Sequence, residues 1–125
     1  MILIKKSALE ACLAGARSAS PNEFIGLLEG EREDNGDILI ERVVLPPGLA
    51  VSESSSSFFP WMVPASINQI GLFHSHPRGP NTQSRADAFS ASKEGGVQLI
   101  ACRPFDFSSV AVYDPRGKRM MMKIV

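Results

Sequence analysis

The 125-residue sequence predicts a single α/β domain, residues 1–125, with a central mixed β-sheet flanked by helices; an α+β arrangement is the alternative. Two observations support this fold class. Segments with the apolar spacing of a helix are interspersed with short apolar runs bounded by Gly, Pro and Asn, which are typical of strands. Several runs are joined by short turns, so most neighbouring strands should be antiparallel. The chain is long enough to bury its own hydrophobic core.

The composition argues against two classes of partner. Thirteen Lys and Arg residues balance thirteen Asp and Glu residues, so the formal net charge is zero. This removes the main electrostatic argument for binding nucleic acid or an anionic membrane. No apolar run approaches the roughly 18 residues of a membrane span, and the first residues lack the order of a signal peptide. We therefore expect a cytoplasmic protein.

The first helix is expected over residues 7–19. Ser7 and Glu10 match a capping box at its start, and Pro21 should end it. Its apolar face follows helical spacing and comprises Leu9, Cys12, Leu13 and Ala16.

A β-hairpin is expected next. Residues 23–30 and 37–45 form two apolar runs, and Asn35-Gly36 lies between them. Asn-Gly between apolar runs is a strong hairpin signal, because both turn residues should tolerate positive φ.

In the second half of the chain, we expect a strand that begins at residue 70 and three further strands after it. The other elements expected there are a polar loop over 52–57, a short helix near 64–69, a strand from 70, a helix over 84–93, strands over 97–102 and 109–113, a turn over 114–117 and a last strand over 119–125.

The two cysteines are expected to be free and buried. Cys12 and Cys102 each lie in apolar surroundings and are too few for a zinc-finger ligand set. A disulfide between them is the alternative.

The only two histidines, His74 and His76, stand two residues apart at the end of an apolar run. Residues i and i+2 of a strand share one face, so both imidazoles should project side by side. Ser84 and Asp87 follow after a loop rich in Gly and Pro. Two His and one Asp suffice to hold zinc and leave one position open for water. Taken alone, Ser84-x-x-Asp87 is also an ordinary helix N-terminus.

These residues carry a resemblance to a known family. The pattern His74-x-His76-Pro, seven intervening residues from 77 to 83, and Ser84-x-x-Asp87 resembles the JAMM (MPN+) metalloprotease motif. The upstream Pro21-x-Glu23-x-x-Gly run resembles the strand that carries that family's catalytic glutamate. The resemblance covers nearly the whole chain and implies a single MPN (cytidine deaminase-like) catalytic domain.

The resemblance also implies a role for each residue. His74, His76 and Asp87 would ligate one zinc ion, and Glu23 and Ser84 would hold a water as the fourth ligand. Glu23 would act as general base and acid, and Ser84 would donate a hydrogen bond to the developing oxyanion. Local chemistry alone does not separate Glu23 from the other upstream glutamates, and only the family match selects it. Those are Glu29, Glu31, Glu33 and Glu41.

The chain looks most similar to the short archaeal members of the family. This implies a zinc isopeptidase, similar to a deubiquitinase, that cuts the bond between the C-terminus of a ubiquitin-like modifier and a lysine amine. Its partners would be that modifier or its conjugates. Phe58, Phe59 and Trp61 could line a groove for the modifier's extended tail, or simply fill the core.

Three other functions are compatible with the sequence. One is a hydrolase that releases cysteine or another adduct from a sulfur-carrier protein. A second is a metal-free MPN scaffold for protein assembly, which the five filled motif positions disfavour. A third is a purely structural zinc site, which usually closes with four protein ligands rather than three.

Overall fold

The computed structural model describes residues 1–45, 50–51, 56–57, 64, 66–85, 87 and 96–125. Their elements comprise an eight-stranded sheet, a two-stranded sheet, an α-helix and a 3-10 helix. The elements are β1 (Ile2–Ile4), α1 (Lys6–Ala19), β2 (Ile25–Arg32), β3 (Ile38–Val44), β4 (Ala50–Val51), β5 (Ser56–Ser57), β6 (Gln69–His76), β7 (Val97–Cys102), η2 (Phe107–Ser109), β8 (Val110–Tyr113), β9 (Arg119–Met120) and β10 (Met122–Ile124). Among the described residues there is no helix of the length and apolarity needed to cross a membrane.

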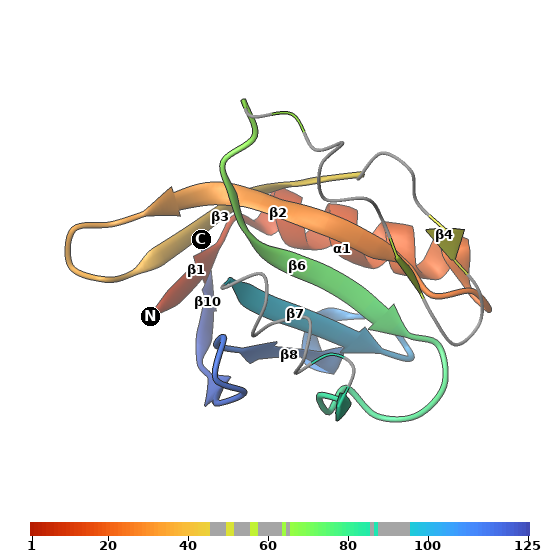
Figure 1. The fold of residues 1–125 in the computed structure, drawn as a ribbon. Helices are drawn as coiled ribbons and strands as arrows, with labels where there is room; N and C mark the ends of the chain where they lie inside the picture. Colours follow the sequence, from red (N-terminus) through yellow and green to blue (C-terminus); the bar gives the residue numbers. More distant parts are fainter. Residues whose placement is uncertain (46–49, 52–55, 58–63, 65, 86, 88–95) are drawn as a thin grey trace.

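The large sheet is mixed, as predicted. Its strand order is β10-β1-β3-β2-β6-β7-β8-β9. β1 pairs in parallel with β3 and β10, and β6 pairs in parallel with β7, whereas the other pairs are antiparallel. Figure 1 shows β2, β6, β7 and β8 side by side, with both termini near β1 and β10. The histidine strand, β7, β8 and the turn after β8 agree with the sequence analysis.

The prediction of one last strand over residues 119–125 is wrong. The segment splits into β9, which pairs with β8, and β10, which pairs with β1 at the other end of the strand order. Only Met121 separates the two strands. The sheet therefore curls so far that one short segment joins its two ends, and this requirement of the whole fold is absent from the local pattern.

β6 lies at the centre of the sheet, with β2 and β7 as neighbours. In the antiparallel β2–β6 pair Ile25 faces His74, and in the parallel β6–β7 pair His76 faces Cys102. The carboxyl end of β6 therefore lies between the beginning of β2 and the end of β7. At the opposite end, Gly71 allows β7 to approach closely, because a Cβ there would lie 2.2 Å from the Val97 carbonyl oxygen.

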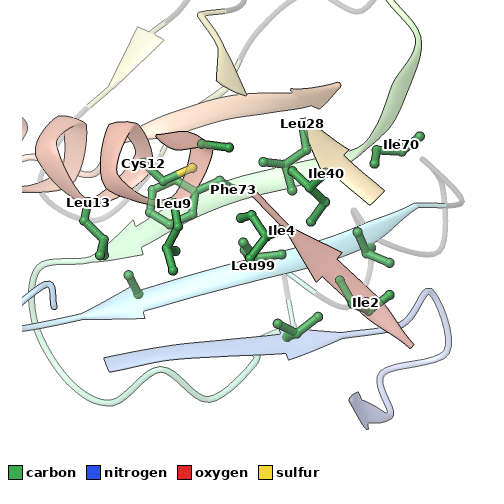
Figure 2. Close-up of a cluster of buried hydrophobic side chains, with 14 of the residues drawn as sticks. Ile2, Ile4, Leu9, Cys12, Leu13, Leu28, Ile40, Ile70, Phe73 and Leu99 are labelled. Atoms are coloured by element: carbon green, nitrogen blue, oxygen red, sulfur yellow. The ribbon is translucent and has the colours of Figure 1, made fainter. Parts of the chain in front are cut away.

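The hydrophobic core fills the space between α1 and one face of the sheet. Leu9, Cys12 and Leu13 of α1 are buried with Phe73 of β6 and Leu99 of β7 (Figure 2). Successive strand side chains point to opposite faces, so the burial of Phe73 under α1 sends its neighbouring histidines to the other face. Core packing thus sets the orientation of the histidines.

Helix α1 forms as expected but begins differently. It starts at Lys6 after an N-cap at Lys5, whose side chain makes no capping hydrogen bond. The capping box predicted at Ser7 and Glu10 is therefore wrong. The Lys5 amide donates to the carbonyl of Ile40 in β3, so the exit from the sheet determines where the helix starts. The helix ends at Ala19, as expected ahead of Pro21.

The predicted hairpin is the β2–β3 pair, with two corrections. Strand β2 begins at Ile25, so Glu23 lies just before it. Gly36 has φ +91°, whereas Asn35 does not have a positive φ. The Asn35 side chain instead accepts a hydrogen bond from the Asp37 amide, in a loop longer than a two-residue turn.

Several predictions concern segments that the structure describes only in part. Ser56 and Ser57 of the expected polar loop form β5, while residues 52–55 lie outside the described residues. In the expected helix near 64–69, the carbonyl of Pro64 accepts from the Ile67 amide in a turn, and Gln69 already belongs to β6. The aromatic residues 58, 59 and 61 also lie outside the described residues, as does most of the helix expected over 84–93.

Both cysteines are free, so the disulfide alternative is wrong. Cys12 is fully buried in the core, as expected, whereas Cys102, at the end of β7, is partly exposed, so its expected burial is wrong. Burial raises the pKa of the Cys12 thiol to about 12. At neutral pH this thiol therefore has almost no reactive thiolate form.

We expect Cys12 to resist thiol reagents until the protein unfolds. In a Cys102→Ser protein, which retains only this thiol, labelling at pH 8 should be negligible in buffer and complete in denaturant. Mass spectrometry after a timed reaction measures both. Rapid labelling of the native variant would contradict the burial of Cys12.

Candidate metal centre

Three side chains meet at the carboxyl end of β6. His74 and His76 come from the strand, and Asp87 comes from the segment after it. One ligand atom from each side chain lies within 4.8 Å of the other two. The Asp87 carboxylate bridges the histidines, with Oδ1 3.3 Å from Nε2 of His74 and Oδ2 3.1 Å from Nε2 of His76. The predicted ligands therefore converge on one point.

The orientation of His76 suits a metal ligand. Its Nδ1 lies 2.9 Å from the carbonyl oxygen of Pro80, which can only accept a hydrogen bond. That contact places the proton on Nδ1 and leaves the Nε2 lone pair directed toward the carboxylate side. In the protonated ring Nε2 donates to Asp87, and this hydrogen bond raises the pKa of His76, although burial opposes the rise; the Pro80 carbonyl adds to it.

His74 is the most deeply buried of the three candidate ligands. It is only 4% exposed, and neither ring nitrogen has a hydrogen-bond partner in the described part of the chain. A buried polar group without a partner typically costs about 1–3 kcal/mol. With carboxylates on both sides of the ring, a cation bound at Nε2 would supply the missing partner. The residues therefore fit a metal ion.

Asp87 is held as a carboxylate by its surroundings. Burial disfavours its charged form, but the hydrogen bond with His76, the proximity of His74 and hydrogen bonds from Ser84 outweigh it. Together they hold the pKa of Asp87 well below its usual value. The group is thus ionised, as a metal ligand must be.

Ser84 and Asp87 form a reciprocal cap. The Ser84 amide donates to Oδ2 of Asp87 at 2.9 Å, and the Asp87 amide donates to Oγ of Ser84 at 3.1 Å. Arg85 and Asp87 have helical backbone. The Ser84–Asp87 pair is therefore an ordinary helix N-terminus and, at the same time, part of the metal site. Oγ of Ser84 thus accepts the Asp87 amide in this cap, and the same hydroxyl also stabilises the charged form of the Asp87 carboxylate.

Glu23 lies on the other side of His74. Its Oε1 is 3.6 Å from Nδ1 of His74, and its side chain is largely buried. Two of the other glutamates considered for the same role pair with basic side chains elsewhere: Glu29 with Arg42, and Glu41 with Lys5. Within the described residues, the fold thus places Glu23 beside His74 and engages Glu29 and Glu41 in ion pairs elsewhere.

Three further residues organise the centre, and the sequence analysis did not identify their roles. Ser75, fully buried, accepts a hydrogen bond from the Phe24 amide at 2.8 Å and so ties the residue after Glu23 to β6. The Pro80 carbonyl orients His76, and Gln98 contacts the Asp87 backbone. Ser75 and Gln98 each carried a signal, as polar residues inside apolar strands, whereas the backbone carbonyl of Pro80 left none.

The fold and the site together define a JAMM/MPN metalloprotease-like domain. Residues 5–121 match the family of prokaryotic homologs of the JAB domain, and the chain belongs to this family. A probable metalloprotease of Haloferax volcanii is 28% identical over 120 residues, which cover 92% of this chain and 74% of that protein.

Solved structures agree with this assignment. A JAB1/MPN domain protein of Archaeoglobus fulgidus is 26% identical, with a TM-score of 0.73 over 100% of this chain and 99% of its own. A second structure, described as the JAMM metalloprotease-like zinc site in the proteasome and signalosome, is 25% identical, with a TM-score of 0.73 over 100% and 98%. The protein DSY2949 of Desulfitobacterium hafniense is 28% identical, with a TM-score of 0.74 over 100% and 93%. The expected family and fold are confirmed, and the metal that suits the three ligands is a single zinc ion.

Removing one ligand should remove the metal. We expect the parent protein to bind about one zinc per chain, as the ligand count requires. Asp87→Ala should lose it, because two imidazoles alone do not complete the site. Metal analysis after dialysis measures the stoichiometry. Asp114→Ala, in the turn after β8 and outside the ligand group, serves as control, and full zinc retention by Asp87→Ala would overturn the ligand assignment.

Proposed function

We propose that this protein is a zinc-dependent isopeptidase that cuts the bond between the C-terminus of a ubiquitin-like modifier and a lysine amine. One observation carries the proposal. A largely buried carboxylate, Glu23, lies 3.6 Å from a histidine of a three-ligand metal site. An acid beside an open metal position is the arrangement that hydrolysis requires.

The residues divide the chemistry between them. Zinc, when bound, supplies Lewis acidity and lowers the pKa of a coordinated water from about 15.7 toward about 7. Glu23 accepts a proton from the attacking water and later hands it to the leaving amine. The Ser84 hydroxyl donates a hydrogen bond to the oxygen of the scissile carbonyl as negative charge develops on it.

The ligand count favours a catalytic over a structural metal. Structural zinc sites close with four protein ligands, whereas three residues converge here among those the structure describes. Cys102 pairs with His76 across β6 and β7, so it is the nearest candidate for a fourth ligand by register. Its sulfur instead lies 3.7 Å from the Ser109 carbonyl oxygen and is not part of the ligand group.

The substrate class rests on the family. A similar zinc site is described in the proteasome and signalosome, and a similar archaeal protein is named a probable metalloprotease. Both support a peptide-type bond in a protein conjugate. A ubiquitin-like modifier joined to a lysine amine provides such a bond.

Incubation with defined adducts tests the proposal. Zinc-loaded protein should release the modifier from ubiquitin-like protein–lysine conjugates; chelator should stop the reaction and added zinc should restore it. Carrier protein–cysteine adducts form the comparison arm. Cleavage of those adducts alone would replace the isopeptidase with a sulfur-carrier hydrolase, and cleavage of neither would favour the non-catalytic scaffold.

Glu23→Gln should keep the zinc and lose hydrolysis. Positioned acid–base catalysis typically contributes about 10²–10⁴-fold, and the amide cannot accept the proton. The turnover rate and the zinc content of the same sample measure the two effects. Glu29→Gln, which removes an acid paired with Arg42, is the matched control and should retain full activity. Undiminished turnover by Glu23→Gln would assign the base to another residue.

A further inference from the structure

Strand β7 places an amide inside the protein. Gln98 is 2% exposed, and its neighbours Val97 and Leu99 point into the core under α1. Because strand side chains alternate, Gln98 faces the other side of the sheet, together with Leu72, its partner on β6. Burying an amide is costly unless its donors and acceptor are paired. The contacts of Gln98 therefore require an explanation.

The two ends of this amide bind both sides of the Ser84–Asp87 cap. Nε2 of Gln98 donates to the Asp87 carbonyl oxygen at 2.9 Å, and Oε1 accepts from Nε2 of Gln83 at 3.1 Å. Gln83 comes directly before Ser84, and Asp87 comes three residues after Ser84. A single buried side chain thus connects β7 to both ends of the segment that carries the third ligand.

A second anchor lies just ahead of that segment. Nδ2 of Asn81 donates to the Ser109 carbonyl oxygen at 2.9 Å, and the Tyr113 hydroxyl lies 3.3 Å from the Asn81 carbonyl oxygen. Tyr113 pairs with Gln98 across β7 and β8. The loop after β6 is therefore fastened to β7 and β8 on the face of the sheet to which Gln98 points.

Such an anchor matters because the three ligands are held differently. His74 and His76 are fixed by the backbone of a central strand with neighbours on both sides. Asp87 lies eleven positions after His76 in the sequence, and its cap with Ser84 fixes only the local geometry. The distance from its carboxylate to the imidazoles depends on contacts that join this segment to the sheet.

We propose that Gln98 is a positioning residue of the metal centre: its side-chain amide holds the 83–87 segment so that Asp87 meets His74 and His76 at the spacing one zinc ion requires. The inference rests on the zinc site and not on the isopeptidase substrate. Partners that orient ligands typically change metal affinity by about 10–100-fold when they are lost.

Zinc affinity in the absence of substrate tests this role. Competition with a chromophoric chelator should show that Gln98→Leu binds zinc about 10–100-fold more weakly than the parent. Val97→Ala, at the next position but facing the core, is the matched control; it should lower the urea midpoint and leave the zinc affinity unchanged. If Val97→Ala lost as much zinc affinity as Gln98→Leu, the loss would reflect general destabilisation of the fold, and the proposal would be overturned.

Gln83→Ala provides a second variant that does not open the interior. It removes the donor to Oε1 of Gln98, and should weaken zinc binding less than Gln98→Leu does. Added to Gln98→Leu it should cause little further loss, because both changes act through one amide. Unchanged zinc affinity in Gln83→Ala, and in Gln98→Leu where that variant folds, overturns the role and leaves the hydrolytic proposal standing. A parent protein that binds zinc but cleaves no conjugate would overturn the hydrolytic proposal and leave the role of Gln98 standing.

Discussion

The burial of His74 is the constraint on which the metal centre depends. Its imidazole sits inside the protein with both nitrogens unpaired in the described part of the chain, between the carboxylates of Glu23 and Asp87. The fold thus contains a polar group that water does not reach and that a bound cation would satisfy. Metal binding and folding are therefore thermodynamically linked, since zinc would bind the folded site and not the dispersed ligands of the unfolded chain.

Sheet topology gathers the residues around that imidazole. Antiparallel pairing with β2 brings the segment ahead of Ile25 alongside His74, and Ser75 ties Phe24 to β6. On the other side, β7 and β8 hold the loop that returns Asp87. Glu23 and Asp87 thus approach the two ring nitrogens of the same histidine from the sides of opposite neighbours of β6.

Several groups of this site stabilise the fold and orient a metal ligand at the same time. The Ser84–Asp87 cap satisfies amides at a helix start and at the same time orients a metal ligand. The Pro80 carbonyl closes a loop and selects the tautomer of His76. The same contacts therefore support the fold and hold the metal ligands in place.

The sequence by itself determined the features that depend on neighbours along the chain: the i, i+2 pair of histidines, the Ser84–Asp87 cap and the β2–β3 hairpin. Periodicity and turn chemistry are local, so they can be read without the fold. Only the tertiary structure decided the rest. The exit from β1 set the helix start, curling of the sheet split the last strand, and strand register separated Glu23 from equivalent acids. The role of Gln98 depends on contacts between segments distant in sequence, which no local pattern encodes.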